Sequence, residues 1–378
     1  MHICFLTNEF PKQGFPHGGI GSFVQTLATA LVKKNIKVSV VGINYTNKDE
    51  TEIIENVNVY RLKKSTIKGL SWYFNSKKIN DKIIEIHKQD PIHIIESPEL
   101  GLAFIKKILN IKYIIRLHGG HHFFAESENR KINKWKGFQE KRSFSKADAF
   151  IAVSQYVKTH TEKYLSYNNK TVAYISNPID TDFFKPIIEN QSEDKIVFAG
   201  TVCEKKGIRQ LIQAFPMVKK EFRNVTLEIY GKDWFFPDDT SYIKMLKDKE
   251  LIKLGDVTKS INFHGSTPYS EIPIAYSGAS VCVFPSHMET QGLVAPEAMA
   301  MEKPVVFTKL GPGPEAIENY RTGLLCDPYN PKDIAEKIIW VLSNKEEAKE
   351  MGKKAREHVL TKYGLENIVC QNIDFYKM

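Results

Sequence analysis

Short apolar segments followed by helical stretches recur along the whole chain, and this recurrence limits the possible folds more than any other feature. Segments such as "HICFLT", "VSVVGI" and "YIIRL" have the length and apolar content of buried strands. Between the first two, residues 20–33 carry apolar side chains at helical spacing. Buried strands that alternate with helices predict a parallel β-sheet covered on both faces. The sequence therefore predicts the α/β fold class.

The length of the chain and a break in this pattern predict two domains. A chain of 378 residues is longer than a single hydrophobic core usually supports. The pattern restarts after the polar stretch "ENQSED" with "KIVFAG", and further strand-like segments follow to "PVVFT". We therefore predict a first doubly wound domain at residues 1–188 and a second at residues 189–363.

Composition restricts the class of protein and its location. The chain is 42% hydrophobic and 26% charged, as is common for soluble globular proteins. It has no apolar run of the roughly 18–20 residues that a membrane span needs, and "MHICFLTNEF" lacks the features of a signal peptide. Five scattered cysteines without a CxxC pair predict a reducing, cytoplasmic location. The net charge of +9 favours anionic partners.

The stretch "SHMETQGLVAPEAMAMEKP" places two glutamates, Glu289 and Glu297, after a predicted buried strand. In open α/β sheets, ligands bind at the carboxyl ends of strands, and a helix N-terminus there can hold a phosphate. Pro296 suits the first turn of the next helix, so Glu297 can reach a ligand at that end. The spacing alone leaves an alternative open, in which Glu297 is only favoured by the helix dipole and Glu289 is a solvated loop residue.

Five sequence blocks in the same order resemble the retaining GT-B glycosyltransferases of family GT4 (glycosyl transferases group 1). Residues 284–327 contain the family's two glutamates with seven residues between them, followed by "EAMA". The other blocks are "HGGIGSFVQTLATAL", "AFIAVS", "ISNPIDTDFFKP" and "FAGTVCEKKGIRQLIQAF". The resemblance implies a GT-B fold, in which two Rossmann-like domains face each other across a cleft. It also implies that the last helix, at about residues 364–378, joins the first domain.

The resemblance further implies a reaction and its substrates. We expect a retaining glycosyltransferase, of the hexosyltransferase type, that moves a sugar from a nucleotide-sugar donor to an acceptor hydroxyl. A glycan or lipid-linked acceptor in polysaccharide or glycolipid biosynthesis is expected, with no cofactor and no obligatory metal. Two alternatives remain. A nucleotide-sugar epimerase of the same architecture would turn over without an acceptor, and a non-catalytic nucleotide-sugar binder would not turn over at all.

The resemblance also assigns roles to individual residues. Glu289, His118 and Lys206 are the implied catalytic residues, at the donor sugar and the leaving diphosphate. Glu297 is implied to bind the nucleotide ribose. The remaining implied donor-binding residues contribute backbone groups or a second positive charge, and they are Gly18, Gly19, Lys205, Thr290, Gln291, Gly292, Leu293 and Val294.

The chain departs from the family pattern at three places. Thr290-Gln291 follows the first acid, where the family often has Gly-Phe. The usual diphosphate-binding arginine is replaced by Thr201, so Lys206 should carry more of the charge neutralisation, with Lys205 as a partner. Glu302 stands where a glycine usually ends the helix, and a left-handed backbone at this position would cost roughly 1 kcal/mol.

Three other patterns suggest different chemistry. The loop with Gly18 and Gly19 differs from a dinucleotide fingerprint because about ten residues separate it from its strand, so NAD binding is disfavoured. A plain turn before a helix remains an alternative to the donor-binding role that the resemblance implies for this loop. "DTD" at residues 180–182 is interpreted as structural. The histidines of "HGGHH", His118, His121 and His122, are not expected to bind a metal because no carboxylate is near them in sequence, and His121 and His122 are expected in a loop.

Two basic stretches interleaved with aromatic residues suggest a membrane partner. Residues 61–88 contain eight Lys and Arg against two acids, and residues 130–146 contain seven against one. Such stretches can dock on anionic membranes, which predicts peripheral association at the inner face of the membrane. Solvated helix faces of a lysine-rich protein are an equally open interpretation. Nucleic acid is not an expected partner.

Overall fold

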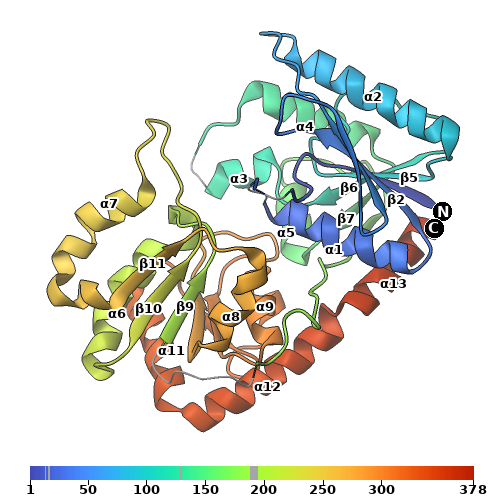
Figure 1. Ribbon diagram of the computed structural model, residues 1–378. Helices are drawn as coiled ribbons and strands as arrows, with labels where there is room; N and C mark the ends of the chain where they lie inside the picture. Colours follow the sequence, from blue (N-terminus) through green and yellow to red (C-terminus); the bar gives the residue numbers. More distant parts are fainter. Residues whose placement is uncertain (13, 16–17, 128–129, 188–194) are drawn as a thin grey trace. The chain divides into compact units, whose positions relative to one another are not determined.

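The computed structural model describes residues 1–12, 14–15, 18–127, 130–187 and 195–378. The chain forms two compact units, Met1–Pro178 with Leu365–Met378, and Ile179–Gly364. The division precedes the predicted boundary between residues 188 and 189, and residues 188–194 lie outside the described part of the chain. The helical end of the chain groups with the first unit (Figure 1).

Within the described residues, the first unit contains an eight-stranded sheet in the order β3-β4-β2-β1-β5-β6-β7-β8. Its neighbouring strands are parallel except β3, which pairs antiparallel with β4. The strands are β1 (His2–Leu6), β2 (Lys37–Ile43), β3 (Glu50–Ile54), β4 (Val57–Leu62), β5 (Ile94–Ser97), β6 (Lys112–Leu117), β7 (Ala149–Ala152) and β8 (Val172–Tyr174).

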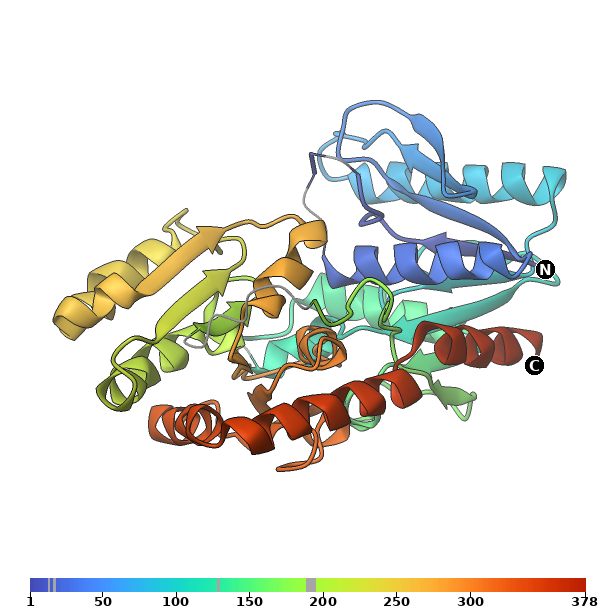
Figure 2. The same cartoon turned by 60° about the horizontal axis from the view of Figure 1, so that its bottom comes forward.

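Helices from both ends of the chain cover this sheet. Buried side chains of α1 (Gly19–Lys33) and α13 (Leu365–Lys377) share one hydrophobic core with the strands, and the two helices, blue and red, lie side by side in Figure 2. Among the described residues, no helix is both long enough and apolar enough to cross a membrane. The helices of this unit are α1 (Gly19–Lys33), α2 (Ser71–Gln89), α3 (His121–Ser127), α4 (Lys134–Lys146), α5 (Gln155–Glu162) and α13 (Leu365–Lys377).

A buried ion pair fixes the last helix to the sheet. Arg116 on β6 donates from Nε to Glu96 Oε1 on β5 at 2.7 Å, and both side chains are almost completely buried. Asn372 Oδ1 on α13 accepts from Arg116 Nη2 at 2.5 Å, and the Tyr376 hydroxyl donates to Glu96 Oε2 at 2.6 Å. Because a buried charge is costly unless its partners are satisfied, these contacts require α13 at this position.

Within the described residues, the second unit contains a six-stranded parallel sheet in the order β11-β10-β9-β12-β13-β14. Its strands are β9 (Lys195–Ala199), β10 (Thr226–Tyr230), β11 (Ile261–Gly265), β12 (Val281–Phe284), β13 (Val305–Thr308) and β14 (Leu324–Cys326). Its α-helices are α6 (Ile208–Glu221), α7 (Tyr242–Lys249), α8 (Ile272–Ser277), α9 (Val294–Ala300), α10 (Gly313–Ala316), α11 (Pro331–Ser343) and α12 (Lys345–Lys362). The described residues of this unit also form the 3-10 segments η1 (Glu204–Lys206), η2 (Leu251–Ser260) and η3 (Tyr269–Glu271).

Strand order locates the expected binding region in each unit. Numbered within the second unit, its strands follow the order 3-2-1-4-5-6 of a doubly wound dinucleotide-binding fold. The order reverses between β9 and β12, and in the first unit it reverses between β1 and β5. Ligands in such sheets bind beyond the carboxyl ends of the strands at this switch point.

Candidate active site

An ion pair joins the two loops at the switch point of the second unit. Lys206 ends η1, which follows β9, and Glu289 lies in the loop after β12. Lys206 Nζ donates to Glu289 Oε1 at 2.5 Å, although the two residues are 83 positions apart in sequence. The Glu289 side chain is 9% exposed and that of Lys206 is 22% exposed. The structure therefore brings together two residues that the sequence predicts as catalytic.

Close backbone contacts fix the position of these two loops relative to each other. His287 donates its backbone N–H to the carbonyl of Lys205 at 2.8 Å. Gly207, directly after η1, has φ +69°, and a Cβ at this position would lie 1.8 Å from the carbonyl oxygen of Pro285. Only glycine permits this approach, because any side chain would both strain the backbone and overlap the facing loop.

Replacing Gly207 with alanine should lower the free energy of unfolding by about 2–5 kcal/mol. This range adds the left-handed strain of about 1–2 kcal/mol to an overpacking cost of about 1–3 kcal/mol. Gly265→Ala is the matched control, because Gly265 has φ +75° but no atom within 4 Å of the added Cβ. Urea denaturation of both variants measures the difference. Equal losses would contradict the proposed contact between the two loops.

The loop after β12 presents the predicted donor-binding residues. Gly292 has φ +74°, and Leu293 is the N-cap of α9. This loop contains Thr290 and Gln291, and Val294 is the first residue of α9. Because α9 has only seven residues, about two turns, few aligned peptide dipoles would face a phosphate at its N-terminus. Side-chain charge is thus more important here than the helix dipole that the sequence suggested.

Glu297 lies in the first turn of α9 and is 6% exposed. Burial raises the pKa of its carboxyl group to about 7, despite a hydrogen bond that Tyr269 donates to Glu297 Oε1 at 3.1 Å. It is therefore a buried, partly protonated acid near neutral pH and not a solvated surface acid. Tyr269 has no local sequence signal, because it lies in a separate 3-10 turn.

The residues around η1 show whether another arginine replaces the diphosphate-binding arginine that is absent at Thr201. Arg209 is near in sequence, but its guanidinium is bound by Glu204, with Nη2 to Oε1 at 2.5 Å. Arg209 is therefore already paired with Glu204 and does not take the role of the arginine that is absent at position 201. Glu302 follows α9 with φ +59°, which agrees with the left-handed backbone considered from the sequence.

His118 and the predicted glycine loop are close together in the first unit. His118 directly follows β6, and its ring lies 5.0 Å from that of Phe23 on α1. Gly18 is the N-cap of α1, and Gly19 is the first residue of the helix. Burial and the neighbouring Arg116 lower the pKa of His118 to about 3. The imidazole is therefore neutral at pH 7 and can hydrogen-bond a ligand without adding charge.

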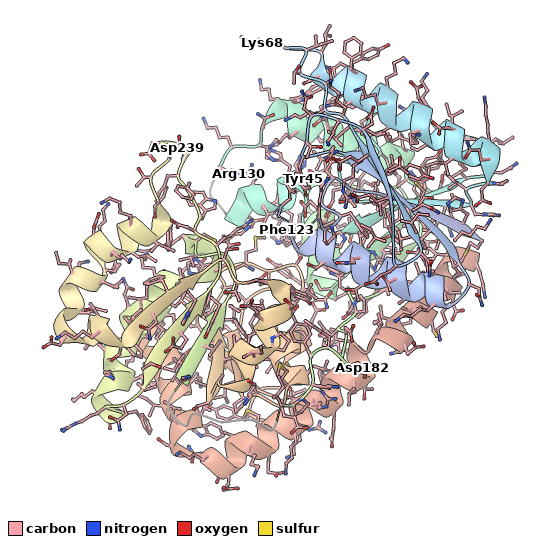
Figure 3. All side chains as sticks on the ribbon, in the orientation of Figure 1. Tyr45, Lys68, Phe123, Arg130, Asp182 and Asp239 are labelled. Atoms are coloured by element: carbon pink, nitrogen blue, oxygen red, sulfur yellow. The ribbon has the colours of Figure 1, made fainter. Side chains whose placement is uncertain are left out.

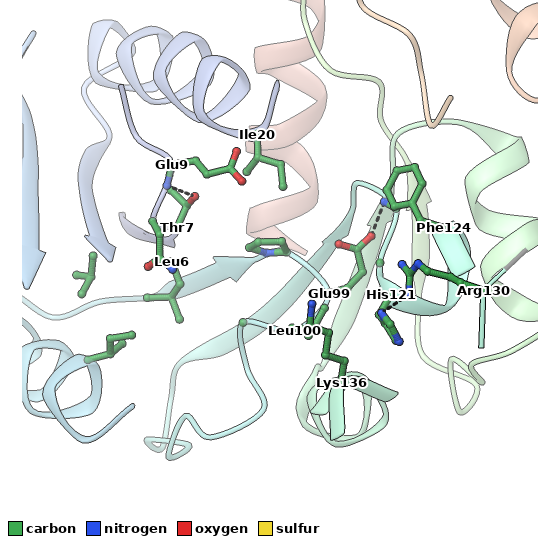
Figure 4. Close-up of a pocket in the computed structure, with 17 residues that line it drawn as sticks. Leu6, Thr7, Glu9, Ile20, Glu99, Leu100, His121, Phe124, Arg130 and Lys136 are labelled. Atoms are coloured by element: carbon green, nitrogen blue, oxygen red, sulfur yellow. Dashed lines mark hydrogen bonds between the residues drawn. The ribbon is translucent and has the colours of Figure 1, made fainter. Parts of the chain in front are cut away.

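A cavity of about 530 Å³ lies at the carboxyl ends of β1, β5 and β6 (Figure 4). Its lining includes Glu9, Glu99, His121, Arg130 and Lys136. The backbone N–H of Gly119 donates to Glu99 Oε1 at 2.6 Å. Burial and repulsion from Glu140 raise the pKa of Glu99 to about 8, so its carboxyl group carries a proton at neutral pH. Glu99 is not among the site residues that the sequence predicts, although Glu99 directly follows the strand segment "HIIESP".

The histidines after His118 differ from the expected loop residues. His121 and His122 are buried and begin α3. Glu140, which is fully buried on α4, accepts from the backbone N–H of His121 at 2.8 Å and of His122 at 3.0 Å, and contacts His122 Nδ1. A carboxylate is thus near these histidines in space, although it is distant in sequence.

The structure also places the candidate metal-binding patterns. In the described part of the chain, no group of three or more His, Cys, Asp or Glu side chains could hold a metal ion. Asp180 Oδ1 of "DTD" accepts backbone N–H groups from Asp182 at 3.1 Å and Phe183 at 3.0 Å. This carboxylate therefore stabilises a turn, as the structural interpretation of "DTD" requires.

Comparison with protein families identifies the chain. The family model Glycosyl transferases group 1 matches residues 180–358, and Glycosyltransferase Family 4 matches residues 17–183. The chain belongs to the GT4-type GT-B glycosyltransferases. An uncharacterized glycosyltransferase of Methanocaldococcus jannaschii is 28% identical, over 92% of this chain and 91% of that protein. The capsular polysaccharide biosynthesis glycosyltransferase CapM of Staphylococcus aureus is 25% identical, over 88% and 87%.

This chain has the same GT-B fold as several solved structures. Sucrose-phosphate synthase from Thermosynechococcus elongatus has a TM-score of 0.85 at 20% identity, over 100% of this chain and 98% of that chain. HepE of Anabaena, in complex with UDP and glucose, has a TM-score of 0.77 at 18% identity, over 100% and 99%. The predictions of a GT4-type glycosyltransferase and of an α/β GT-B fold are therefore confirmed.

Proposed function

We propose that this glycosyltransferase binds a nucleotide-sugar donor on its second unit and transfers the sugar to an acceptor hydroxyl with retention of configuration. The observation that carries the proposal is the Lys206–Glu289 ion pair at the β9–β12 switch point, with buried Glu297 on the adjoining helix. HepE, which shares the fold, has been solved with UDP and with UDP-glucose, which supports a nucleoside-diphosphate sugar as donor.

Each side chain has a chemical task in this reaction. The leaving diphosphate gains negative charge as the glycosidic bond breaks, and Lys206 stabilises that charge. Glu297 accepts hydrogen bonds from the ribose hydroxyls, and Glu289 accepts from the donor sugar. Because Glu289 is already bound by Lys206, it is better suited to positioning than to nucleophilic attack. This favours front-face attack by the acceptor, assisted by the departing phosphate.

The cavity of the first unit is the proposed acceptor site. Its protonated Glu99 can donate a hydrogen bond, and His121 and Lys136 add further polar groups for a hydroxylated ligand. Neutral His118 is proposed to contact the donor sugar. The name of CapM supports polysaccharide biosynthesis as the pathway, with a glycan or lipid-linked acceptor.

Transfer should continue in the presence of excess EDTA. The charge of the leaving diphosphate is assigned to Lys206, Lys205 and backbone N–H groups, so no step requires a divalent metal. Initial rates with EDTA, and with EDTA followed by excess Mn²⁺ or Mg²⁺, provide the measurement. Activity that disappears with EDTA and returns with metal would contradict this assignment.

A thermal-shift screen with UDP-, GDP- and ADP-sugars tests the donor. A ligand at about 100 times its Kd stabilises the native state by about 2.7 kcal/mol, which raises Tm measurably. We expect sugars of one base to raise Tm in the wild-type protein, and a smaller shift in Glu297→Gln. If no nucleotide sugar changes Tm, the proposed donor site is wrong. A bound donor that is epimerised without an acceptor, or never turned over, would favour the two alternative functions.

A further inference from the structure

Aromatic side chains from three segments of the first unit form one surface cluster. Trp72 and Tyr73 lie on α2, Phe104 follows β5, and Trp135 and Phe138 lie on α4. The ring centroids of Trp72 and Phe104 are 4.5 Å apart, and those of Trp72 and Trp135 are 5.5 Å apart. Trp135 stacks with both Phe104 and Phe138 at 5.7 Å. These five residues are called the aromatic cluster below.

The aromatic cluster is largely open to solvent. Trp72 is 37% exposed and Trp135 44%, while Tyr73 and Phe138 are each 50% exposed. Single exposed apolar residues are ordinary, but a contiguous patch of this kind marks an interaction site. Exposed aliphatic side chains in the adjoining segments extend the apolar character, namely Ile67, Leu70 and Ile132.

Positive charge surrounds the aromatic cluster with little compensation. On α4, the single acid is Glu140, which is fully buried and bound to the backbone of α3. On α2, the two acids Asp81 and Glu85 are already paired with lysines of the same helix. Lys68, in the segment before α2, points away from the unit (Figure 3). Exposed cations of α4 and its preceding residues add to this charge, namely Lys131, Lys134, Lys141 and Arg142.

The placement of two lysines opposes the stability of α4. The helix begins with Lys134 and Lys136 and has no acid in its first turn, where the helix dipole disfavours positive charge. Its N-terminus is stabilised instead by Asn133, whose side chain accepts from the N–H groups of Trp135 and Lys136. Cations at this end are thus unfavourable for folding. Lys136 lines the proposed acceptor cavity, whereas Lys134 does not line it and is left for an external partner.

A second cavity, of about 620 Å³, adjoins the aromatic cluster. Trp72 and Phe104 line it together with one acid, Asp81, and several cations, namely Lys77, Lys106, Lys107, Arg142 and Lys146. Lys77 is paired with Asp81 and Lys107 with Asp148, so Lys106, Arg142 and Lys146 are the cations of this cavity in excess of its acids. Burial, and to a lesser extent the nearby Arg142, lower the pKa of Lys146. An anion between Arg142 and Lys146 would be attracted by both side chains.

We propose that this face of the first unit binds the surface of an anionic phospholipid bilayer. Headgroup phosphates occupy the cavity beside Arg142 and Lys146, and the aromatic rings lie at the boundary between headgroups and acyl chains. A lipid surface fits better than a nucleic acid, because the exposed side chains that extend the cluster, Ile67, Leu70 and Ile132, are aliphatic and have no stacking or hydrogen-bonding role toward bases. The proposal concerns a surface of the first unit and does not depend on the donor site.

Vesicle co-sedimentation of the full chain tests this surface. Wild-type protein should bind vesicles of phosphatidylcholine with phosphatidylglycerol far more tightly than vesicles of phosphatidylcholine alone. Each lysine near an anionic surface contributes about five-fold to binding, so Lys134→Glu with Lys141→Glu should lower it at least about 25-fold. Trp135→Ser with Phe138→Ser should also reduce binding, and both effects should weaken as salt rises.

A matched control separates this surface from the overall basicity of the protein. Lys349→Glu with Lys354→Glu makes the same change in net charge on exposed positions of α12. This control should bind vesicles as the wild type does. An equal loss in the control would overturn the proposal, as would equal binding to neutral and anionic vesicles. Binding to single-stranded nucleic acid without vesicle binding would also overturn it and assign the surface to that partner.

Discussion

Replacing Lys206 with alanine should lower kcat by about two to three orders of magnitude, the scale found when one strong electrostatic stabiliser is removed. Thr201 stands where the family has a diphosphate-binding arginine, and Arg209 is bound by Glu204. Lys206 is also paired, but its partner Glu289 lies in the loop after β12 that is proposed to hold the donor, so Lys206 is the cation best placed to stabilise the leaving diphosphate. Steady-state kinetics at saturating donor provide the measurement, with folding checked by circular dichroism.

The ion pair with Glu289 permits a sharper test of what Lys206 does. Because Glu289 is itself proposed to bind the donor sugar, the double variant Lys206→Ala with Glu289→Gln is compared with Glu289→Gln alone. If Lys206 acts only through Glu289, the two variants should have the same kcat. If Lys206 acts on the diphosphate, the double variant should be slower than Glu289→Gln alone by about the factor lost in Lys206→Ala. Near-normal kcat in Lys206→Ala would contradict the assignment and leave the diphosphate to backbone N–H groups.

Lys205 serves as the neighbouring control. Lys205→Ala should lower kcat less than Lys206→Ala, because Lys206 forms the ion pair with Glu289. If Lys205 takes the place of the missing arginine, the two losses should be similar and non-additive.

Replacing Glu297 with glutamine should weaken nucleoside-diphosphate affinity by about tenfold or more. A hydrogen bond to a charged group contributes about 1.5–3 kcal/mol, and glutamine keeps the shape but not the charge. Isothermal titration calorimetry at pH 8, where Glu297 is mainly ionised, measures the difference. Unchanged affinity would mean that the ribose is bound elsewhere.

The raised pKa of Glu297 also gives a signed pH dependence. Its carboxyl group has a pKa of about 7 in the folded protein, above the ordinary value of 4.5. Between these two pH values the folded chain holds a proton that the unfolded chain has lost. The contribution of Glu297 to the free energy of unfolding therefore falls as pH rises, and it is constant above about pH 7. Nucleotide affinity should instead rise through pH 7, as the carboxylate forms. Both dependences should be smaller in Glu297→Gln.

Much of the fold was predictable from the sequence because buried parallel strands have a strong local signature. "KIVFAG" and "VCVFPS" contain β9 and β12, whose carboxyl ends carry the proposed donor site. Glu289, Glu297 and Lys206 were identified because they lie in sequence blocks with a recognisable order. The left-handed backbone at Glu302 was predictable because a glycine usually ends the helix at this position, and Glu302 has φ +59°.

The remaining features depend on contacts between distant segments. The Lys206–Glu289 ion pair joins residues 83 positions apart, and Tyr269 reaches Glu297 from a separate turn. The raised pKa of Glu99 depends on burial and on Glu140, which comes from another helix. The aromatic cluster likewise needs α2 and α4 to meet. None of these contacts has a signature in a short stretch of sequence.

Proton NMR of the first sugar product tests the proposed reaction most directly. The wild-type protein is mixed with the donor found by thermal shift, and the anomeric signal is followed before mutarotation, with water or an added glycan as acceptor. Retaining transfer predicts stoichiometric nucleoside diphosphate and a first product with the anomeric configuration of the donor, both strongly reduced in Lys206→Ala. A first product of inverted configuration, or an epimerised nucleotide sugar without net nucleoside-diphosphate release, would contradict it.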